Sequence, residues 1–149
     1  MTRQRLRMAL RLRTVASFRQ TIARQALVSA NRALSAAAED LREAENALVW
    51  LETRRRQEVA AESADISVIK SLDAARDLAG DAWEQRSRVR DECRALVEWK
   101  TAEWTDARRR ESGFDDHYER ALGESHAAQS RIEAASAIEA WIAGLGAPR

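Results

Sequence analysis

The stretch that decides the fold is residues 27–51, which read LVSANRALSAAAEDLREAENALVWL. Apolar residues follow one another here in alternating steps of three and four: Leu27, Ala30, Leu34, Ala37, Leu41, Ala44, Leu48 and Leu51. This is the heptad pattern of a helix that packs against another helix along a narrow seam. Alanine at most of the alternate positions lets two helices approach closely, and each contact is weakly stabilising because alanine buries little area.

Toward the N-terminus the apolar stripe changes its spacing. Val15, Phe18, Ile22, Ala26 and Ala30 follow one another in steps of four after the first step. A run of four-residue steps shifts the phase of a heptad seam. We therefore expect locally altered winding near residues 18–30, without a break in the helix.

The composition excludes most other fold classes. Pro148 is the single proline, Gly80 is the first of five glycines, and the bulky residues Leu, Ile, Val and Phe number 13, 6, 7 and 2 in 149 residues. Sheet-rich folds need frequent turns, which this sequence lacks. Disorder is typical of a high net charge, whereas 25 basic and 24 acidic residues leave +1 here. The fold classes that remain are a long helix and a coiled coil.

A turn is expected where the heptad pattern ends. The segment ESADIS, residues 62–67, contains Ser63, Asp65 and Ser67, and each of these residue types can cap a new helix. We predict helices over about 4–60 and 67–143, a turn at 61–66 and a tail at 144–149 that includes Pro148. Ser112 and Asp115 resemble a capping box, so the second helix either bends near residues 112–114 or passes straight through them.

The second helix carries a broader apolar stripe, which includes Val89, Cys93 and Leu96. With Leu27, Leu34, Leu41, Leu48 and Leu51 these residues form the expected coiled-coil seam. Two thin stripes on consecutive long helices can be buried only against each other, if the chain folds back as an antiparallel hairpin, or against a partner. The predicted fold is therefore all-α, a single antiparallel coiled-coil hairpin over residues 1–149.

Charge is segregated along the chain. Residues 1–32 contain eight Arg and no Asp or Glu, so the other 117 residues carry 17 basic and 24 acidic side chains. A hairpin brings this basic segment beside the acid-containing stretch from Glu111 to Glu139, which can neutralise part of it. The positive charge that is not neutralised in this way predicts either a solvated face or a surface that binds an acidic partner or a polyanion.

The sequence contains no residue pattern that indicates catalysis or cofactor binding. His117 and His126 are nine positions apart, too far to share a metal from one helix, and no glycine-rich phosphate loop occurs. Cys93 is the single cysteine and lies on the expected seam. We expect a non-enzymatic protein without cofactors or metals.

The localisation is inferred from the lack of long apolar segments. No apolar run approaches the length of a membrane span or a signal-peptide core, so we expect a cytoplasmic protein without a membrane span. An Arg-rich, acid-free start also occurs in organelle transit peptides, which is an alternative interpretation.

The five tryptophans are the most informative aromatic residues. A two-helix seam has little interior in which to bury an indole, so some tryptophans must be partly exposed, and exposed tryptophan is typical of binding hot spots. Trp50 lies 14 residues before the midpoint of the turn and Trp83 lies 19 after it. They pack across the hairpin or mark a binding surface near the turn.

This layout of a basic first helix, the turn ESADIS and a longer second helix resembles the FliJ/YscO family, the central stalks of bacterial type III secretion and flagellar export. The segment ESGFDDHYER, residues 111–120, is similar to a stretch of that family in which a hydrophobic residue and two acids precede an arginine. The resemblance implies a hairpin whose joined ends insert into a hexameric export ATPase and whose turn end contacts the membrane export gate. Export chaperones are further partners that it allows.

Position and charge then suggest which residues make these contacts. For the ATPase we expect Arg3, Arg5, Arg7, Arg11, Arg13, Ile132, Ile138 and Trp141. For the export gate we expect Trp50, Arg54, Arg55 and Arg56.

Two other classes of function stay open. A coiled-coil scaffold or chaperone-like adaptor would use the same seam to form an oligomer. A polyanion-binding protein would use the basic end on phosphates, with an affinity that falls steeply with salt. The net acidic remainder and the absence of a groove-reading motif argue against nucleic acid as a partner.

Overall fold

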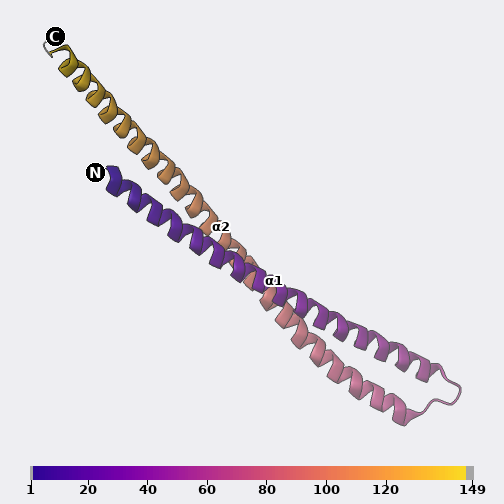
Figure 1. Cartoon of the computed structure of the whole chain (residues 1–149). Helices are drawn as coiled ribbons and strands as arrows, with labels where there is room; N and C mark the ends of the chain where they lie inside the picture. The colour runs from indigo at the N-terminus through magenta and orange to yellow at the C-terminus, as the bar shows by residue number, and fades with distance from the viewer. Residues whose placement is uncertain (1, 147–149) are drawn as a thin grey trace. The chain divides into compact units, whose positions relative to one another are not determined.

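The computed structural model describes residues 2–146, which form two helices and no strand (Figure 1). Helix α1 spans Thr2–Ala60 and helix α2 spans Ile66–Leu145. This confirms the predicted all-α hairpin of two long helices. Helix α1 begins two residues before its expected start and ends at the expected residue, whereas α2 begins one residue earlier and ends two residues later than expected. Gly144 thus lies inside α2, in a stretch predicted as tail. Residues 147–149, including Pro148, lie outside the described residues.

Helix α2 continues through residues 112–114, the segment where the sequence left open a bend or an uninterrupted helix. Residues 111–116 are helical throughout, so backbone hydrogen bonding is not interrupted at Ser112. Gly113 has no left-handed backbone conformation, and nothing lies within 4 Å of a Cβ placed on it. One glycine weakens a helix by only about 1 kcal/mol relative to alanine, which long helical flanks on both sides can offset.

The turn occupies residues 61–65, and one of the three candidate caps is used. The carboxylate of Asp65 accepts a hydrogen bond from the backbone N–H of Ser67, with an N–O distance of 2.8 Å. The backbone N–H of Asp65 donates to the carboxylate of Glu58 at 3.2 Å. Asp65 is therefore the N-cap of α2, because its side chain satisfies one of the donors that the first helical turn leaves free.

The chain divides into two units, each of which takes one segment from each helix. Unit 1 consists of Met1–Ala23 and Trp104–Arg149, and unit 2 consists of Arg24–Glu103. Unit 1 thus contains both chain ends, and unit 2 contains the turn.

Cross-helix contacts in unit 2 define an antiparallel register. Arg55 pairs with Asp73 through Nε and Oδ1 at 2.5 Å, and the indole N–H of Trp83 donates to the Glu45 carboxylate at 3.4 Å. Ten residues back along α1, from 55 to 45, correspond to ten residues forward along α2, from 73 to 83. In unit 1, Arg13 pairs with Asp115 in the same register, with an Nε–Oδ1 distance of 2.7 Å.

The buried residues of α1 are almost all alanines spaced by seven. Among the described residues, those buried from water are Ala9, Ala16, Ala30, Ala37, Leu41, Ala44 and Ala121. Ala23 is half-buried and completes the series between Ala16 and Ala30. Alanine at these positions leaves room for larger side chains of α2, such as Phe114 and Tyr118, which are half-buried.

The expected phase shift near residues 18–30 is not seen in the burial pattern. Val15, Phe18 and Ile22 are 49%, 68% and 53% exposed. The face of α1 directed to α2 instead keeps seven-residue spacing from Ala9 to Ala44. The larger apolar residues of this segment therefore lie on a second face of α1, beside the seam.

Candidate functional surfaces

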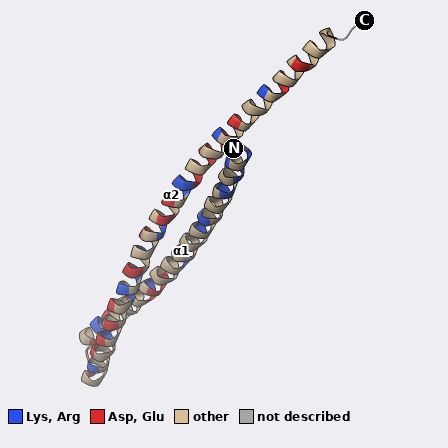
Figure 2. Ribbon diagram, turned by 90° about the vertical axis from the view of Figure 1, so that its left-hand side faces the viewer, with Lys and Arg blue, Asp and Glu red and all other residues tan. Residues whose placement is uncertain are grey.

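The basic N-terminal segment of α1 is mostly unpaired. Arg3, Arg5, Arg7 and Arg11 are exposed, and none of them forms an ion pair within residues 2–146. Figure 2 shows several blue Lys and Arg positions near the N-terminus of α1. The segment thus keeps most of its positive charge available to a partner.

Arg13 differs from the other arginines because it links the two helices of unit 1. Its Nε lies 2.7 Å from Oδ1 of Asp115, and its guanidinium carbon lies 4.9 Å from the centre of the Tyr118 ring. The side chains of Arg13 and Asp115 are 43% and 45% exposed, so solvent screens the pair. Arg13, one of the residues expected to contact the ATPase, thus makes a cross-helix contact within the chain.

A groove lies between the two helices of unit 1 beside this contact. It has a volume of about 460 Å³ and is lined by Arg5, Met8 and Leu12 from α1. From α2 it is lined by His117, Arg120, Ala121 and Glu124. Of the residues that line it, only Arg5 was expected from the sequence to contact a partner. The available signal was the seven-residue spacing of Met8, Val15 and Ile22, one position before the buried alanines.

The C-terminal segment of α2 extends beyond the start of α1 in unit 1 (Figures 1 and 2). In the register of Arg13 and Asp115, Arg3 lies level with Ser125. Ile132, Ile138 and Trp141 come after this level and are 61%, 58% and 67% exposed. The structure therefore separates the expected ATPase surface into a basic part on α1 and an apolar part on α2.

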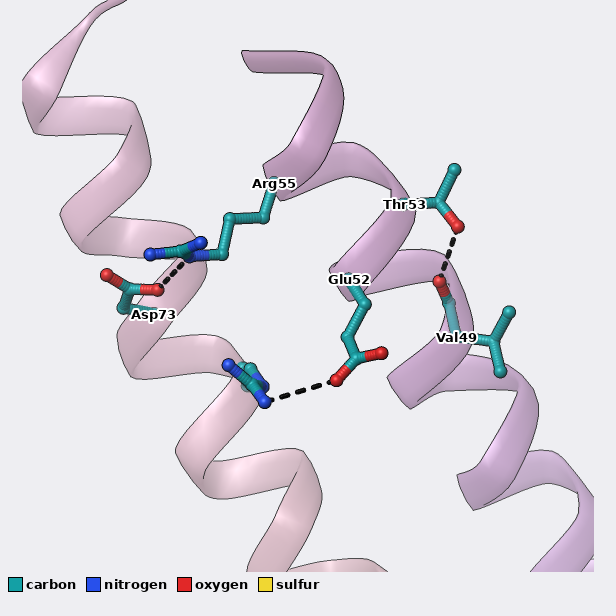
Figure 3. A network of polar contacts seen from close by, with 6 residues as sticks. Val49, Glu52, Thr53, Arg55 and Asp73 are labelled. Carbon is teal, nitrogen blue, oxygen red and sulfur yellow. Dashed lines mark hydrogen bonds and ion pairs between the residues drawn. The ribbon is translucent and has the colours of Figure 1, made fainter. Parts of the chain in front are cut away.

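The expected gate surface in unit 2 is only partly free. Trp50 is 63% exposed. Arg55 pairs with Asp73, and Arg54 lies 4.0 Å from the carboxylate of Glu58. Figure 3 shows Arg55 beside Asp73 and, one turn back along α1, Glu52, which pairs with Arg76. Arg56 is exposed but lies on a different side of α1 from Trp50, because six residues correspond to about 240° of helical rotation.

The expected seam residues differ in their burial. Leu41 is 6% exposed, and Leu27, Leu34, Leu48, Leu51 and Cys93 are half-buried. Val89 and Leu96 are 44% and 42% exposed, whereas Arg90 and Val97, one residue further along, are half-buried. The face of α2 directed to α1 thus runs through Arg90, whose charged group reaches outward to Asp91 at 2.7 Å.

Two other features of the described residues bear on function. Neither helix contains a segment with the length and hydrophobicity of a membrane span over its described residues. No group of three or more His, Cys, Asp and Glu side chains in this part of the chain is arranged to hold a metal ion.

Comparison with known proteins finds no family model, curated protein or solved structure that matches this chain.

Proposed function

We propose that this protein is a non-enzymatic central stalk of a type III secretion or flagellar export apparatus, which links a hexameric export ATPase to the membrane export gate. The observation that carries the proposal is the set of exposed, unpaired arginines on α1 in the unit that holds both chain ends. An end that binds inside a protein ring must present side chains to its surroundings rather than to its own helices.

The charges of the two units support two different partners. Unit 1 has 12 basic and 8 acidic residues, a net charge of +4, and unit 2 has 13 basic and 16 acidic residues, a net charge of −3. Opposite net charges on the two units favour different partner surfaces and steer each unit toward its own partner. In this proposal the ATPase presents carboxylates to Arg3, Arg7 and Arg11.

The apolar end of α2 supplies the second part of the ATPase contact. Ile132, Ile138 and Trp141 are exposed, and an exposed tryptophan flanked by aliphatic residues is typical of an interface hot spot. Arginine contacts set the orientation of the stalk, and apolar burial supplies most of the affinity.

The gate contact is proposed to centre on Trp50. Arg54 lies one helical turn after Trp50 on the same side of α1, so the two side chains can contact one partner surface. The register also places Leu78, which is 71% exposed, level with Trp50 on α2. Because Arg55 is engaged by Asp73, its contribution is to hold the helices together beneath this surface.

Charge reversal tests the ATPase contact. The variant Arg3→Glu/Arg7→Glu/Arg11→Glu is compared with the wild type for binding to the hexameric export ATPase of the same organism and for stimulation of its ATP hydrolysis. The matched control is Arg24→Glu/Arg32→Glu/Arg42→Glu, which makes the same charge change at exposed arginines of unit 2 that form no ion pair within residues 2–146.

We expect the first variant to lose binding and stimulation while the control retains both. Unchanged ATPase binding by the first variant would refute the proposed contact.

A coiled-coil scaffold is the second candidate function. The heptad of α2 continues beyond the start of α1 through Ala128, Ile132, Ala135 and Ile142, and all but Ala128 are exposed. A free heptad segment favours association with another helix. The molar mass in solution separates the two: a monomer is expected of the stalk and a stable oligomer of the scaffold.

A further inference from the structure

The groove of unit 1 has an apolar base and charged edges. Ala121 is 8% exposed at its base, and Met8 and Leu12 form its apolar wall with exposures of 66% and 37%. Arg5 and Arg120 supply positive charge from opposite helices, and Glu124 is the one carboxylate that lines the groove. A ligand that fits must therefore combine apolar groups with negative charge.

The helices that form the groove are held together at the same level. Ala9, next to Met8, is 1% exposed, so α1 and α2 are in close contact there. The ion pair of Arg13 with Asp115 and the stacking of Arg13 over Tyr118 join the helices about one turn further along α1. The groove is thus present before any partner binds, which lowers the entropic cost of association.

An unpartnered apolar face extends from the groove along α1. Met8, Val15 and Ile22 recur every seven residues, each one position before an alanine of the seam, and are 66%, 49% and 53% exposed. Leu12 and Phe18 lie between them on the same side of the helix. One residue corresponds to about 100° of rotation, so this face lies beside the seam and not on it. Met8, Leu12 and Val15 have the spacing i, i+4 and i+7. Apolar residues with this spacing form the contact face of an amphipathic helix that packs against a partner.

The charge beside this face selects the kind of helix. Arg5, Arg11 and Arg19 flank the apolar residues, and residues 3–32 contain no acidic side chain. A basic helix would be repelled, and an uncharged one would leave the arginines without partners. Carboxylates on the flanks of an incoming helix would face Arg5 on one side and Arg120 on the other.

We propose that this face of unit 1 binds an acidic amphipathic helix of a partner protein, which converts the two-helix packing into a three-helix one. Its apolar residues contact Met8, Leu12 and Val15, and its carboxylates pair with Arg5 and Arg120. The inference deepens the proposed function and rests on it for the identity of the partner, a helix of the export ATPase.

A synthetic peptide tests this inference without the ATPase. The probe is a fluorescent 21-residue peptide of three heptads, with Leu and Ile at the two apolar positions of each heptad and Glu at the flanking positions. One control peptide has Lys in place of Glu. A second keeps Glu but has Ser in place of Leu and Ile, so it carries the charge alone. Binding to the full-length protein is measured by fluorescence anisotropy.

The matched variants are Met8→Ser/Val15→Ser/Ile22→Ser in unit 1 and Val49→Ser/Val59→Ser in unit 2, where both valines are more than half exposed. Circular dichroism is used to check that both variants keep the helical content of the wild type. We expect the acidic amphipathic peptide to bind the wild type and the unit 2 variant, and to bind the unit 1 variant at least about tenfold more weakly. Arg5→Glu should also weaken binding.

Two results would overturn the inference. One is equal binding of the charge-only peptide, which would mean that the arginines act without the groove. The other is unchanged affinity of the unit 1 variant. If that variant also binds the ATPase as the wild type does, while reversal of Arg3, Arg7 and Arg11 abolishes binding, the stalk function stands and the groove inference fails. If instead the peptide binds as expected but the wild-type protein does not bind the ATPase, the groove inference stands and the stalk function fails.

Discussion

The two units join the same two helices with different sets of side chains. In unit 2 the helices are connected by Arg55 with Asp73, Arg76 with Glu52 and Trp83 with Glu45. The guanidinium of Arg86 also donates to the backbone carbonyl of Asp40 at 3.0 Å. In unit 1, Arg13 joins the helices through its ion pair with Asp115 and its position over the Tyr118 ring. Unit 2 thus uses its charges to hold its own helices, and unit 1 leaves most of its charges for other molecules.

Apolar residues follow the same division. Leu41 in unit 2 is the one bulky side chain among the buried residues of the described chain, and the buried residues of unit 1 are Ala9, Ala16 and Ala121. The larger apolar residues of α1 in unit 1, such as Met8 and Phe18, are exposed. Little apolar area therefore stabilises unit 1 internally, and much remains for a partner to bury.

Replacement of Leu41 tests whether unit 2 holds the main apolar contact. Leu41→Ala should lower the free energy of unfolding by about 2–4 kcal/mol, because it removes a buried side chain and leaves a cavity. Urea unfolding followed by circular dichroism measures the change. Val49→Ala, at a position 64% exposed, is the control and should change the free energy by less than about 0.5 kcal/mol. Equal effects of the two substitutions would contradict the assignment of Leu41 to the core.

The tryptophans of the two units provide a second comparison. The indole N–H of Trp83 donates to Glu45, whereas that of Trp104 in unit 1 is buried with no hydrogen-bond acceptor among the described residues. Trp83→Phe removes a hydrogen bond, but Trp104→Phe removes an unsatisfied donor. We expect Trp104→Phe to leave the protein more stable than Trp83→Phe by about 1 kcal/mol in thermal unfolding. The opposite order would show that the Trp104 N–H has a partner in solution.

The ion pair of Arg13 with Asp115 in unit 1 should contribute little to the free energy of unfolding. Arg13→Ala loses an ion pair that is about half exposed and the stacking on Tyr118, so the free energy of unfolding should fall by about 0.5 kcal/mol. A double-mutant cycle with Asp115→Ala isolates the pair, and its coupling energy should decrease in high salt. Arg11→Ala, at an exposed arginine, is the control. A coupling energy that salt leaves unchanged would mean that the pair is shielded from solvent.

Several features followed directly from the residues. The heptad from Leu27 to Leu51, the scarcity of glycine and proline and the capping residues at 63–67 were sufficient to predict two helices and the turn, because helix propensity and capping are local properties. The basic segment at residues 3–13 was also visible in the sequence. The choice of Asp65 among three candidate caps could not be made, since Ser63 and Ser67 have similar capping ability.

Which apolar stripe of residues 8–23 faces α2 could not be read from the chain. Met8, Val15 and Ile22 repeat with the same spacing as Ala9, Ala16 and Ala23, and hydrophobicity favours the larger set. Packing reverses the choice, because the opposing residues of α2 include bulky side chains such as Tyr118 that need a small neighbour. The groove beside Met8 and the pairing of Arg13 also result from this packing of the alanine stripe of α1 against α2.

Helicity, the position of the turn and the segregation of charge are thus encoded locally, residue by residue. The identity of the buried stripe, the arginine that is paired and the surfaces that remain free depend on which side chains two helices bring to the same level. That register is a property of both helices together, so it appears only when the chain is folded.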